Sequence, residues 1–564
     1  MLDTRSKKLL GTITLAALAA VTLVVAPYTL IDPINLPKLS ALAFFSIVAL
    51  SLLVPTIKHL FNSEFKILVI LISLFAFQIV LVLLFSGANF GGQIYGTFGR
   101  NTGALAYLSL TVLLMSSALI ADGEFIKKFL RVTVIVGVIL IVYGNIQYFN
   151  LDPLPFVTAY TVNAPVGTLG NSNFQSAFMG IITVVAFTMA LNKSFRAAIR
   201  VGLAIVGFAA VVVIYETLAK QGYFALLAGA LVVVILWLFM NNRKTLGVAV
   251  SGFGAIGAGL VFLGLINFGP LASFLYKSSL EARGYYWRAA INMLIDHPFF
   301  GVGMDGYIDW FRRSRPSSFY ENGFFSFSNS AHNVYLDIAS NGGAPLILVY
   351  FAIIALVILS IFRVVKRNSG FDIHFVVIVG AWAAYQAQSI VSINQLGLAI
   401  WGWVLTGLII GYEINTRDVK IEKDLGVKNK QPQRKAKVVT QQLSSATILR
   451  VFGGVMVGAI VVIPLYYANA SFFSALKSGD IKAVQTAAYL KPIDERRLLH
   501  VATILRDDKM DSEAIAVLRD ATKGYPDSFD FWQLWTTIPT AAPADIAAAK
   551  AEMMRLDPFN PDIR

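Results

Sequence analysis

Long apolar segments recur along most of this chain, and short polar segments separate them. Each apolar segment holds about 20 residues, which is enough for an α-helix to cross the hydrocarbon core of a bilayer. About thirteen such spans are predicted. They cover residues 9–26, 39–56, 67–86, 103–121, 128–147, 173–191, 199–216, 222–240, 246–266, 343–363, 374–391, 396–413 and 448–467. The pattern therefore predicts an all-α, polytopic helical membrane protein with about twelve or thirteen transmembrane helices.

The composition supports this class and removes several others. Hydrophobic residues make up 57% of the chain and charged residues only 14%, which no soluble globular domain matches. Arg5, Lys7 and Lys8 precede the first span as in a secretory signal, but its apolar run is long, so we expect a retained helix. The absence of cysteine excludes disulfides, thiolate metal sites and cysteine nucleophiles.

Basic residues predict the orientation. Threading the spans alternately places most Lys and Arg in one set of loops, which the positive-inside rule assigns to the cytoplasm. Residues 414–447 would form a basic cytoplasmic linker, and the residues after 470 would lie outside the cell. The net charge of +14 is then a topology signal with some contact to anionic membrane lipids, and no nucleic-acid partner is expected.

Basic residues on the opposite face stand out because its short loops carry almost no charge. The insertion bias disfavours them there, so we expect a function to retain them. Guanidinium groups bind phosphate oxygens in pairs, and histidine is the usual base near neutral pH. The outer face would hold Arg100, Lys220 and a large loop, residues 267–342, with Arg283, Arg288 and His332. This set suits an anionic, phosphate-bearing substrate.

Each of these residues also has a structural interpretation. A lone histidine at a membrane interface is more often structural than catalytic, and only the neighbouring basic residues favour catalysis by His332. The other histidines offer less: His59 and His374 fall on the cytoplasmic side, His297 precedes a proline in a turn, and His500 lies near the C-terminus.

Uncharged polar residues are the next candidates. Asn171 and Asn173 open the span at 173–191, where they either cap the helix or face an anion or sugar hydroxyls. The outer end of the span at 374–391 is also polar, which suits either a sugar-lined cavity or hydrogen bonds between helices. Its polar residues are Gln386, Gln388, Ser392, Asn394 and Gln395.

Two further patterns predict no cofactor and no metal. Gly301, Gly303 and Gly306 match a dinucleotide fingerprint, but no strand–helix unit surrounds them, so we expect tight turns instead. Asp305 and Asp309 are isolated carboxylates that the neighbouring Arg312 and Arg313 could neutralise. With no paired-carboxylate motif on the outer face, the expected chemistry is metal-independent.

The composition changes after residue 469. Residues 1–469 would form the membrane domain, and 470–564 a small extracytoplasmic α-helical domain. Its spaced small residues and prolines read as two or three degenerate tetratricopeptide-type helix pairs, as in Ala514, Leu518, Ala521, Pro526 and the segment 556–561. Such arrays usually present a surface for a protein partner, although this one could instead cover the mouth of the site.

With these residues in hand, the chain resembles the O-antigen ligase and polymerase superfamily of membrane glycosyltransferases. The resemblance spans about Arg100 to Trp403. It is strongest in Arg283–Arg288, in the segment 297–303, and in His332-Asn333 followed ten residues later by Gly343. The C-terminal segment is similar to the tetratricopeptide tail of many relatives.

The resemblance implies transfer of a glycan from a polyprenyl-diphosphate carrier to an acceptor hydroxyl at the outer face of the cytoplasmic membrane. His332 would activate that hydroxyl, and Arg100, Arg283 and Arg288 would hold the diphosphate. Attack from the opposite face would invert the anomeric centre. Lys220, Gln221, Asn171, Asn173 and Asn333 are further expected substrate contacts.

One departure concerns Lys220-Gln221-Gly222, where many relatives have Ser-Arg-Gly. Either Lys220 substitutes as a point charge, or that contact is lost.

Two groups of alternatives remain open. Within the same chemistry, the enzyme could be a polysaccharide polymerase or a protein O-oligosaccharyltransferase, which differ in acceptor. A transporter of the lipid-linked glycan is less favoured, because the ionisable residues cluster at one interface and no internal repeat is evident.

Overall fold

The fold is entirely helical throughout the residues that the computed structural model describes, namely 2–154, 164–276, 278–324, 327–367, 370–417 and 443–563. Ten stretches are long and apolar enough to cross a membrane. They are α1 (Thr4–Leu23), α2 (Asn35–Leu53) with its continuation through α3 (Ile57–Phe61), α4 (Lys66–Phe85), α8 (Ser172–Ala190), α9 (Ala197–Glu216), α10 (Gln221–Met240), α11 (Lys244–Leu265), α16 (Val334–Arg367), α18 (Leu396–Asn415) and α20 (Ser445–Ser478). The predicted polytopic helical membrane protein is confirmed.

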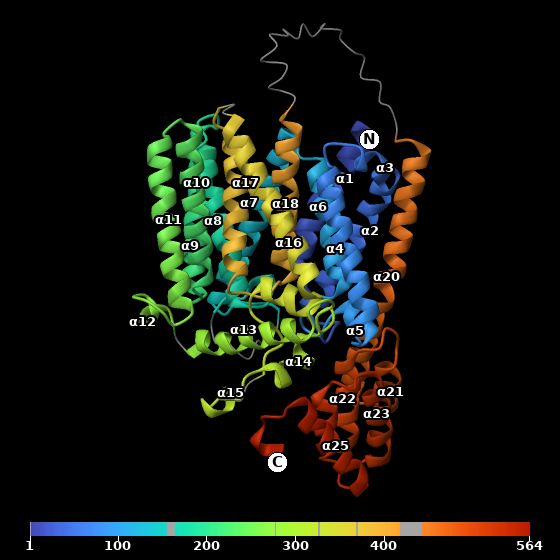
Figure 1. The fold of residues 1–564 in the computed structure, drawn as a ribbon. Helices are drawn as coiled ribbons and strands as arrows, with labels where there is room; N and C mark the ends of the chain where they lie inside the picture. The colour runs from blue at the N-terminus through green and yellow to red at the C-terminus, as the bar shows by residue number, and fades with distance from the viewer. Residues whose placement is uncertain are drawn as a thin grey trace.

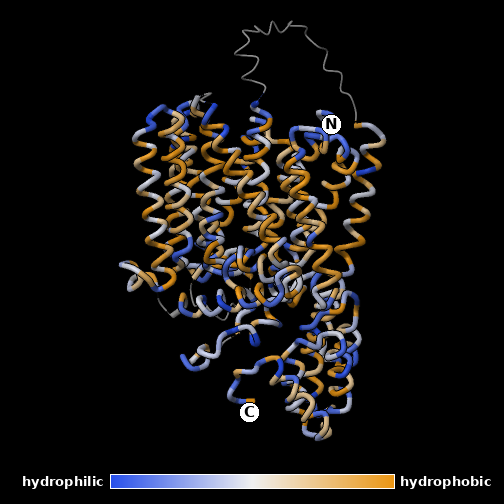
Figure 2. Tube along the Cα trace, viewed as in Figure 1, coloured by the Kyte–Doolittle hydropathy of each residue, from blue (hydrophilic) through white to orange (hydrophobic). Residues whose placement is uncertain are grey.

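Three further helices run beside these through the same layer: α6 (Ala104–Leu119), α7 (Gly123–Tyr148) and α17 (Ile373–Ser389) (Figure 1). α6 and α17 are shorter than the others, and the first turns of α7 carry several charged residues. Every span predicted from hydropathy therefore corresponds to a helix. The apolar residues form a broad band with polar residues at both ends (Figure 2).

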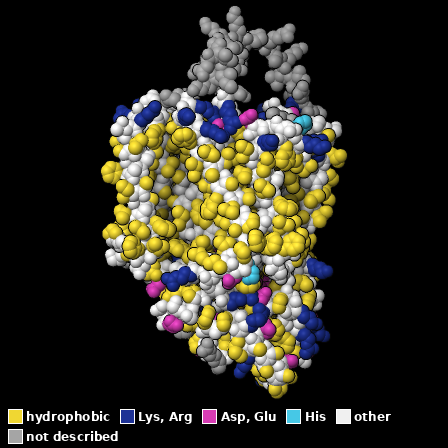
Figure 3. All heavy atoms as spheres, in the orientation of Figure 1, with side chains coloured by type: hydrophobic (Ala, Val, Ile, Leu, Met, Phe, Trp, Pro, Cys, Tyr) yellow, Lys and Arg dark blue, Asp and Glu magenta, His cyan; other side chains and the backbone are white. Residues whose placement is uncertain are grey.

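The two ends of the bundle differ in charge. Lys and Arg gather at the end that holds the N-terminus, whereas the opposite end carries mixed charges and the C-terminal helices (Figure 3). This distribution agrees with the orientation expected from the loops, which remains a prediction. Most of the expected basic linker, residues 418–442, lies outside the described residues.

The bundle is built around α18 and α8, whose apolar windows are 89% and 83% buried, whereas those of α11 and α20 are 6% and 11% buried. Glycines allow α18 to approach α6 closely. A Cβ on Gly407 or Gly411 would lie 2.1 Å from the carbonyl oxygen of Leu114 or Ala118, respectively. Small residues at such contacts are what membrane helices use to pack, because apolar burial alone does not distinguish a neighbouring helix from lipid.

A break in α16 shapes the end of the bundle that holds the polar loops. Gly343 has φ 75° and ψ 177°, and the next amide, of Ala344, donates to the carbonyl oxygen of Pro298 at 2.7 Å. The Gln78 side chain on α4 donates to the carbonyl oxygens of Phe299 (2.6 Å) and Gly342 (3.2 Å). The segment 297–303 is therefore seated against the broken helix.

The glycines of that segment form turns, as expected. Gly301 and Gly303 have φ values of 60° and 100°, and a Cβ on Gly301 would lie 2.4 Å from the carbonyl oxygen of Ser340.

Short helices cover this end of the bundle: α5 (Phe90–Tyr95), α12 (Ala272–Leu275), α13 (Ser278–Asp296), α14 (Tyr307–Ser314) and α15 (Ser318–Glu321). Figure 1 shows α13 lying across the bundle and α14 and α15 between it and the C-terminal helices. Those are α21 (Ile481–Ala488), α22 (Glu495–Asp507), α23 (Asp511–Gly524), α24 (Phe529–Trp535) and α25 (Pro543–Leu556). Their assignment to tetratricopeptide repeats remains a prediction.

Gly343→Ala is expected to destabilise the protein by about 3 kcal/mol or more, because it combines an unfavourable φ with backbone overlap. Its Cβ would lie 2.6 Å from the backbone of Phe299. Thermal unfolding in detergent measures the effect. Gly257→Ala on α11 is the matched control, because nothing lies within 4 Å of that Cβ position. Equal melting temperatures for the two variants would contradict the role given to the break.

Candidate functional site

His332 lies at the turn that leads into α16. Its φ is 52°, a left-handed conformation that is uncommon outside glycine. Its amide donates to Ser330 Oγ at 3.1 Å, and the preceding amide, of Ala331, donates to Asp337 Oδ1 at 2.8 Å. The Asn333 side chain caps α16 by accepting from the amides of Tyr335 (3.0 Å) and Leu336 (3.1 Å). The turn is thus fixed from both sides, which is how a strained residue is held in place.

The ring of His332 is engaged on one side only. Nδ1 lies 3.3 Å from the carbonyl oxygen of Ser330 and 3.2 Å from its hydroxyl, and the Tyr286 ring lies 5.5 Å away, centroid to centroid. Among the described residues, Nε2 has no hydrogen-bond partner. Donation from Nδ1 to the carbonyl would leave Nε2 as the acceptor, which is the tautomer that a general base requires.

The environment keeps this imidazole neutral. The pKa of His332 is lowered to about 4, chiefly by burial and next by the charge of Arg283; the Ser330 carbonyl opposes this, and Arg100 contributes a smaller decrease. Two of the predicted arginines therefore act on the histidine in the folded protein.

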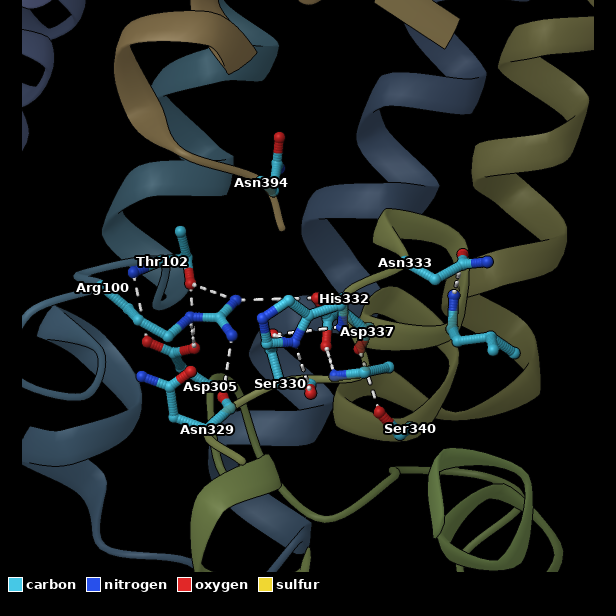
Figure 4. A network of polar contacts seen from close by, with 12 residues as sticks. Arg100, Thr102, Asp305, Asn329, Ser330, His332, Asn333, Asp337, Ser340 and Asn394 are labelled. Carbon is cyan, nitrogen blue, oxygen red and sulfur yellow. Dashed lines mark hydrogen bonds and ion pairs between the residues drawn. The ribbon is translucent and has the colours of Figure 1, made fainter. Parts of the chain in front are cut away.

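Arg100 is buried at the centre of this network (Figure 4). Its Nη1 donates to the carbonyl oxygen of Asn329 at 2.7 Å, and its Nε and Nη2 lie 3.6 Å from carboxylate oxygens of Asp305 and Asp337. Burial lowers the pKa of Arg100, but the carboxylates of Asp305 and Asp337 outweigh it and raise the pKa overall. The charge of Arg100 is therefore largely balanced within the protein.

Arg283 is placed differently. It lies on α13 with its side chain half-buried, and neither a hydrogen bond nor an ion pair engages it among the described residues. Burial lowers its pKa, with a small opposing effect of Tyr286. A partly desolvated guanidinium without a carboxylate partner is suited to bind an anion.

Arg288 is exposed on the same helix, five residues further on, where its guanidinium lies 5.6 Å from the centroid of the Tyr285 ring. No contact in the described part of the chain joins it to His332. The structure thus brings together His332, Arg283, Arg100 and Asn333, and leaves Arg288 exposed on the same helix as Arg283.

The other predicted substrate contacts lie elsewhere at this end of the bundle. Asn171 caps α8 by accepting from the amide of Asn173 at 2.8 Å, which is the structural role considered from the sequence. Lys220 precedes α10, and the buried side chain of Gln221 donates to the carbonyl oxygen of Val391 at 3.3 Å. A substrate role for these residues remains a prediction.

The polar end of α17 forms bonds between helices. Gln386 accepts from the Tyr335 hydroxyl at 2.7 Å, and Asn394 bridges the hydroxyls of Tyr385 and Tyr107. These contacts match the interpretation that this polar end forms hydrogen bonds between helices, which was the alternative to a sugar-lined cavity.

The pairing considered for Asp305 requires a correction. Asp305 faces Arg100 and accepts from the Thr97 amide (2.8 Å) and the Thr102 hydroxyl (2.8 Å), so neither Arg312 nor Arg313 neutralises it. Those arginines lie 3.5 Å and 2.9 Å from Asp530 and Asp527 of the C-terminal helices. Sequence proximity misled because the chain turns at Asp305, whose φ is 59°. Within the described ranges, no cluster of three His, Cys, Asp or Glu residues could hold a metal ion.

The fold and these residues define a polytopic membrane protein with a histidine and arginine centre at one end of its helical bundle. Comparison with protein families gives a match of the O-antigen ligase family to residues 205–351, and comparison with curated proteins gives no match. The match at residues 205–351 supports the O-antigen ligase superfamily, which the motifs predicted. The matched region includes His332, Arg283 and Arg288 but ends before the C-terminal helices.

The helices and the family match together support a multi-pass membrane protein with a region of the O-antigen ligase type.

Arg100→Met is expected to destabilise the fold by about 3–5 kcal/mol, since it leaves two buried carboxylates without their cation. Arg288→Met should change stability by less than about 0.5 kcal/mol, because that side chain is exposed. Thermal unfolding of both variants checks this contrast. A wild-type melting temperature for Arg100→Met would show that Asp305 and Asp337 do not depend on it.

Proposed function

We propose that this protein is an O-antigen ligase-type glycosyltransferase. It moves a glycan from a polyprenyl-diphosphate carrier to an acceptor hydroxyl at the outer face of the cytoplasmic membrane, inverts the anomeric centre and uses no metal. The observation that carries the proposal is a neutral histidine, His332, with hydrogen bonds on one side of its ring only, beside the guanidinium of Arg283, which has no carboxylate partner in the described part of the chain.

Arg283 is the proposed main contact of the donor diphosphate. The diphosphate would supply the anion that this half-buried guanidinium lacks, and negative charge grows on it as the anomeric bond breaks. A hydrogen-bonding group that is already in place stabilises that charge without reorganisation of the site. Arg288, exposed on the same helix, would contact the diphosphate or its sugar nearer to solvent.

Arg100 has a less direct role than the family resemblance implied. Its ion pairs with Asp305 and Asp337 hold the loops around His332, and its balanced charge leaves little capacity for a second strong anion. Its proposed role in the site is to position the turn that carries His332 and to add a positive electrostatic potential.

In the transfer step the acceptor oxygen attacks the anomeric carbon, and its proton passes to Nε2 of His332. The carbon–oxygen bond to the diphosphate breaks, and the electron pair leaves with the polyprenyl diphosphate. His332 then returns its proton to water or to the departing diphosphate. General-base assistance of this kind contributes roughly 10²–10⁴-fold to the rate.

The remaining polar residues would contact the sugars. Lys220, Gln221, Asn171 and Asn173 lie at the starts of α10 and α8, at the same end of the bundle as His332, whereas Asn333 acts by capping α16. The acceptor stays open: a lipid, a growing polysaccharide or a protein would each meet the same chemistry. A lipid-linked glycan transporter remains the less favoured alternative.

His332→Asn is expected to lower kcat by about 10²–10⁴-fold while donor binding stays near normal, because asparagine cannot accept the proton. Asparagine is preferred to alanine because it tolerates the left-handed backbone of this turn. Single-turnover transfer and donor binding in nanodiscs measure the two effects. His297→Asn is the control, since that ring lies against Trp310 outside the network. Near-normal turnover of His332→Asn would overturn the assignment.

The pH dependence of kcat/KM gives a second test. A base must be unprotonated, and the lowered pKa of His332 keeps it so as the pH falls through 6.5; activity is then lost only as the pH approaches about 4. Arg283→Gln removes a nearby positive charge, so the pKa of His332 rises and the acid limb moves toward 6.5. An acid limb at the same pH in both proteins would exclude coupling between Arg283 and His332.

A further inference from the structure

We infer that the C-terminal helices position Arg283 in the site, through a buried ion pair between Arg315 and Asp557. The inference rests on the proposed role of Arg283, and it makes Asp557 a positioning residue that touches no substrate. The two residues are far apart in the sequence: Arg315 follows α14 in the loop region, and Asp557 ends α25.

The pair is buried, and one guanidinium nitrogen contacts both carboxylate oxygens. Nη2 of Arg315 donates to both carboxylate oxygens of Asp557, at 2.8 Å and 2.7 Å, and the two side chains are 1% and 0% exposed. The Tyr320 hydroxyl on α15 donates to the same carboxylate at 2.9 Å. Asp557 therefore binds α15 and the end of α14 at one point.

Other contacts surround the pair and fix its orientation. The Arg315 guanidinium lies 4.7 Å and 4.4 Å from the centroids of the Phe319 and Tyr320 rings. Arg312 lies 4.0 Å from the centroid of the Phe529 ring on α24, and its Nη2 is 3.5 Å from Asp530. Aromatic rings packed against guanidinium groups restrict their freedom.

The same two short helices, α14 and α15, pack against α13. From α14, the Tyr307 hydroxyl donates to the carbonyl oxygen of Tyr286 at 2.8 Å, and the carbonyl oxygen of Ser314 accepts from the Asn292 side chain at 2.8 Å. From α15, Phe319 packs its ring 5.4 Å from that of Tyr285. These contacts all lie C-terminal to Arg283 on α13, and those at Tyr285 and Tyr286 fall within one turn of it.

The chain of contacts ends at the histidine. Tyr286 on α13 places its ring 5.5 Å from that of His332, and the charge of Arg283 reaches the imidazole. A displacement of α14 and α15 would therefore change both the packing of α13 and the electrostatic environment of His332.

A buried ion pair is weak support for stability as such, because desolvation offsets most of its attraction. Its geometric specificity is the stronger effect, since a buried nitrogen held by both oxygens of one carboxylate leaves the guanidinium few positions. The arrangement of Arg315 and Asp557 is thus better explained by placement of the loop helices than by stability. Small misplacements at a catalytic centre reduce rates strongly.

The test compares three variants of the full chain: Asp557→Asn, Tyr320→Phe and Asp508→Asn. Asp557→Asn should lower kcat/KM by about tenfold or more and move its acid limb toward that of an ordinary histidine, because the charge of Arg283 leaves His332. Tyr320→Phe removes one hydrogen bond and should give a smaller change in the same direction. Asp508, exposed at the end of α22, is the matched control on the same domain and should behave as wild type.

A second measurement does not depend on transfer. The chain has no cysteine, so single cysteines at Ile291 on α13 and Leu348 on α16, both exposed, can be spin-labelled specifically. The distance distribution between the labels should broaden or shift in Asp557→Asn and stay unchanged in Asp508→Asn.

Three outcomes separate the possibilities. Unchanged distances and an unchanged acid limb in Asp557→Asn overturn the inference. If Asp557→Asn does not fold, wild-type distances and pH profile in Tyr320→Phe overturn it. If wild-type protein transfers no glycan but the distances still respond to Asp557→Asn, the proposed function fails while the positioning of α13 by the C-terminal helices stands.

Discussion

The buried contact of Arg100 with Asp305 and Asp337 is the interaction on which the site depends. It joins the loop before α6, the turn after the segment 297–303 and the first turn of α16. Burying any one of these charges without a partner would carry a large desolvation penalty. Together the charges offset one another. Because Asp337 also accepts from the Ala331 amide, the contact reaches the turn that holds His332 in its unusual backbone conformation.

From the sequence, Arg100 and Arg283 were expected to share one role, binding of the diphosphate. The structure gives them different surroundings. Arg100 is balanced by carboxylates and organises the loops, whereas Arg283 keeps its charge available for an anion. Burial lowers the pKa of the histidine and both arginines lower it further, so the base is neutral at ordinary pH. The cost is reduced basicity, which suits the proposed reaction, because its leaving group, a lipid diphosphate, would depart readily without strong assistance.

Much of the fold follows from hydropathy, because each apolar segment of bilayer length has to be helical to satisfy its backbone in lipid. The superfamily and the grouping of His332 with Arg283 also follow from motifs and their expected side of the membrane. The partners of Arg100 do not, since Asp305 and Asp337 are over 200 residues distant along the chain and only the folded loops bring them together. The positive φ of Asp305 likewise explains why the neighbouring Arg312 and Arg313 face the C-terminal helices instead.

The central claim is that this protein transfers a glycan from a polyprenyl-diphosphate carrier to an acceptor hydroxyl. The most direct measurement incubates the purified wild-type protein in lipid vesicles with a polyprenyl-diphosphate-linked glycan, with and without an acceptor glycolipid, and follows free polyprenyl diphosphate. The account predicts release that requires the acceptor, with the glycan appearing on it in equal amount. Movement of intact donor across the bilayer without its consumption would contradict the account and favour a transporter.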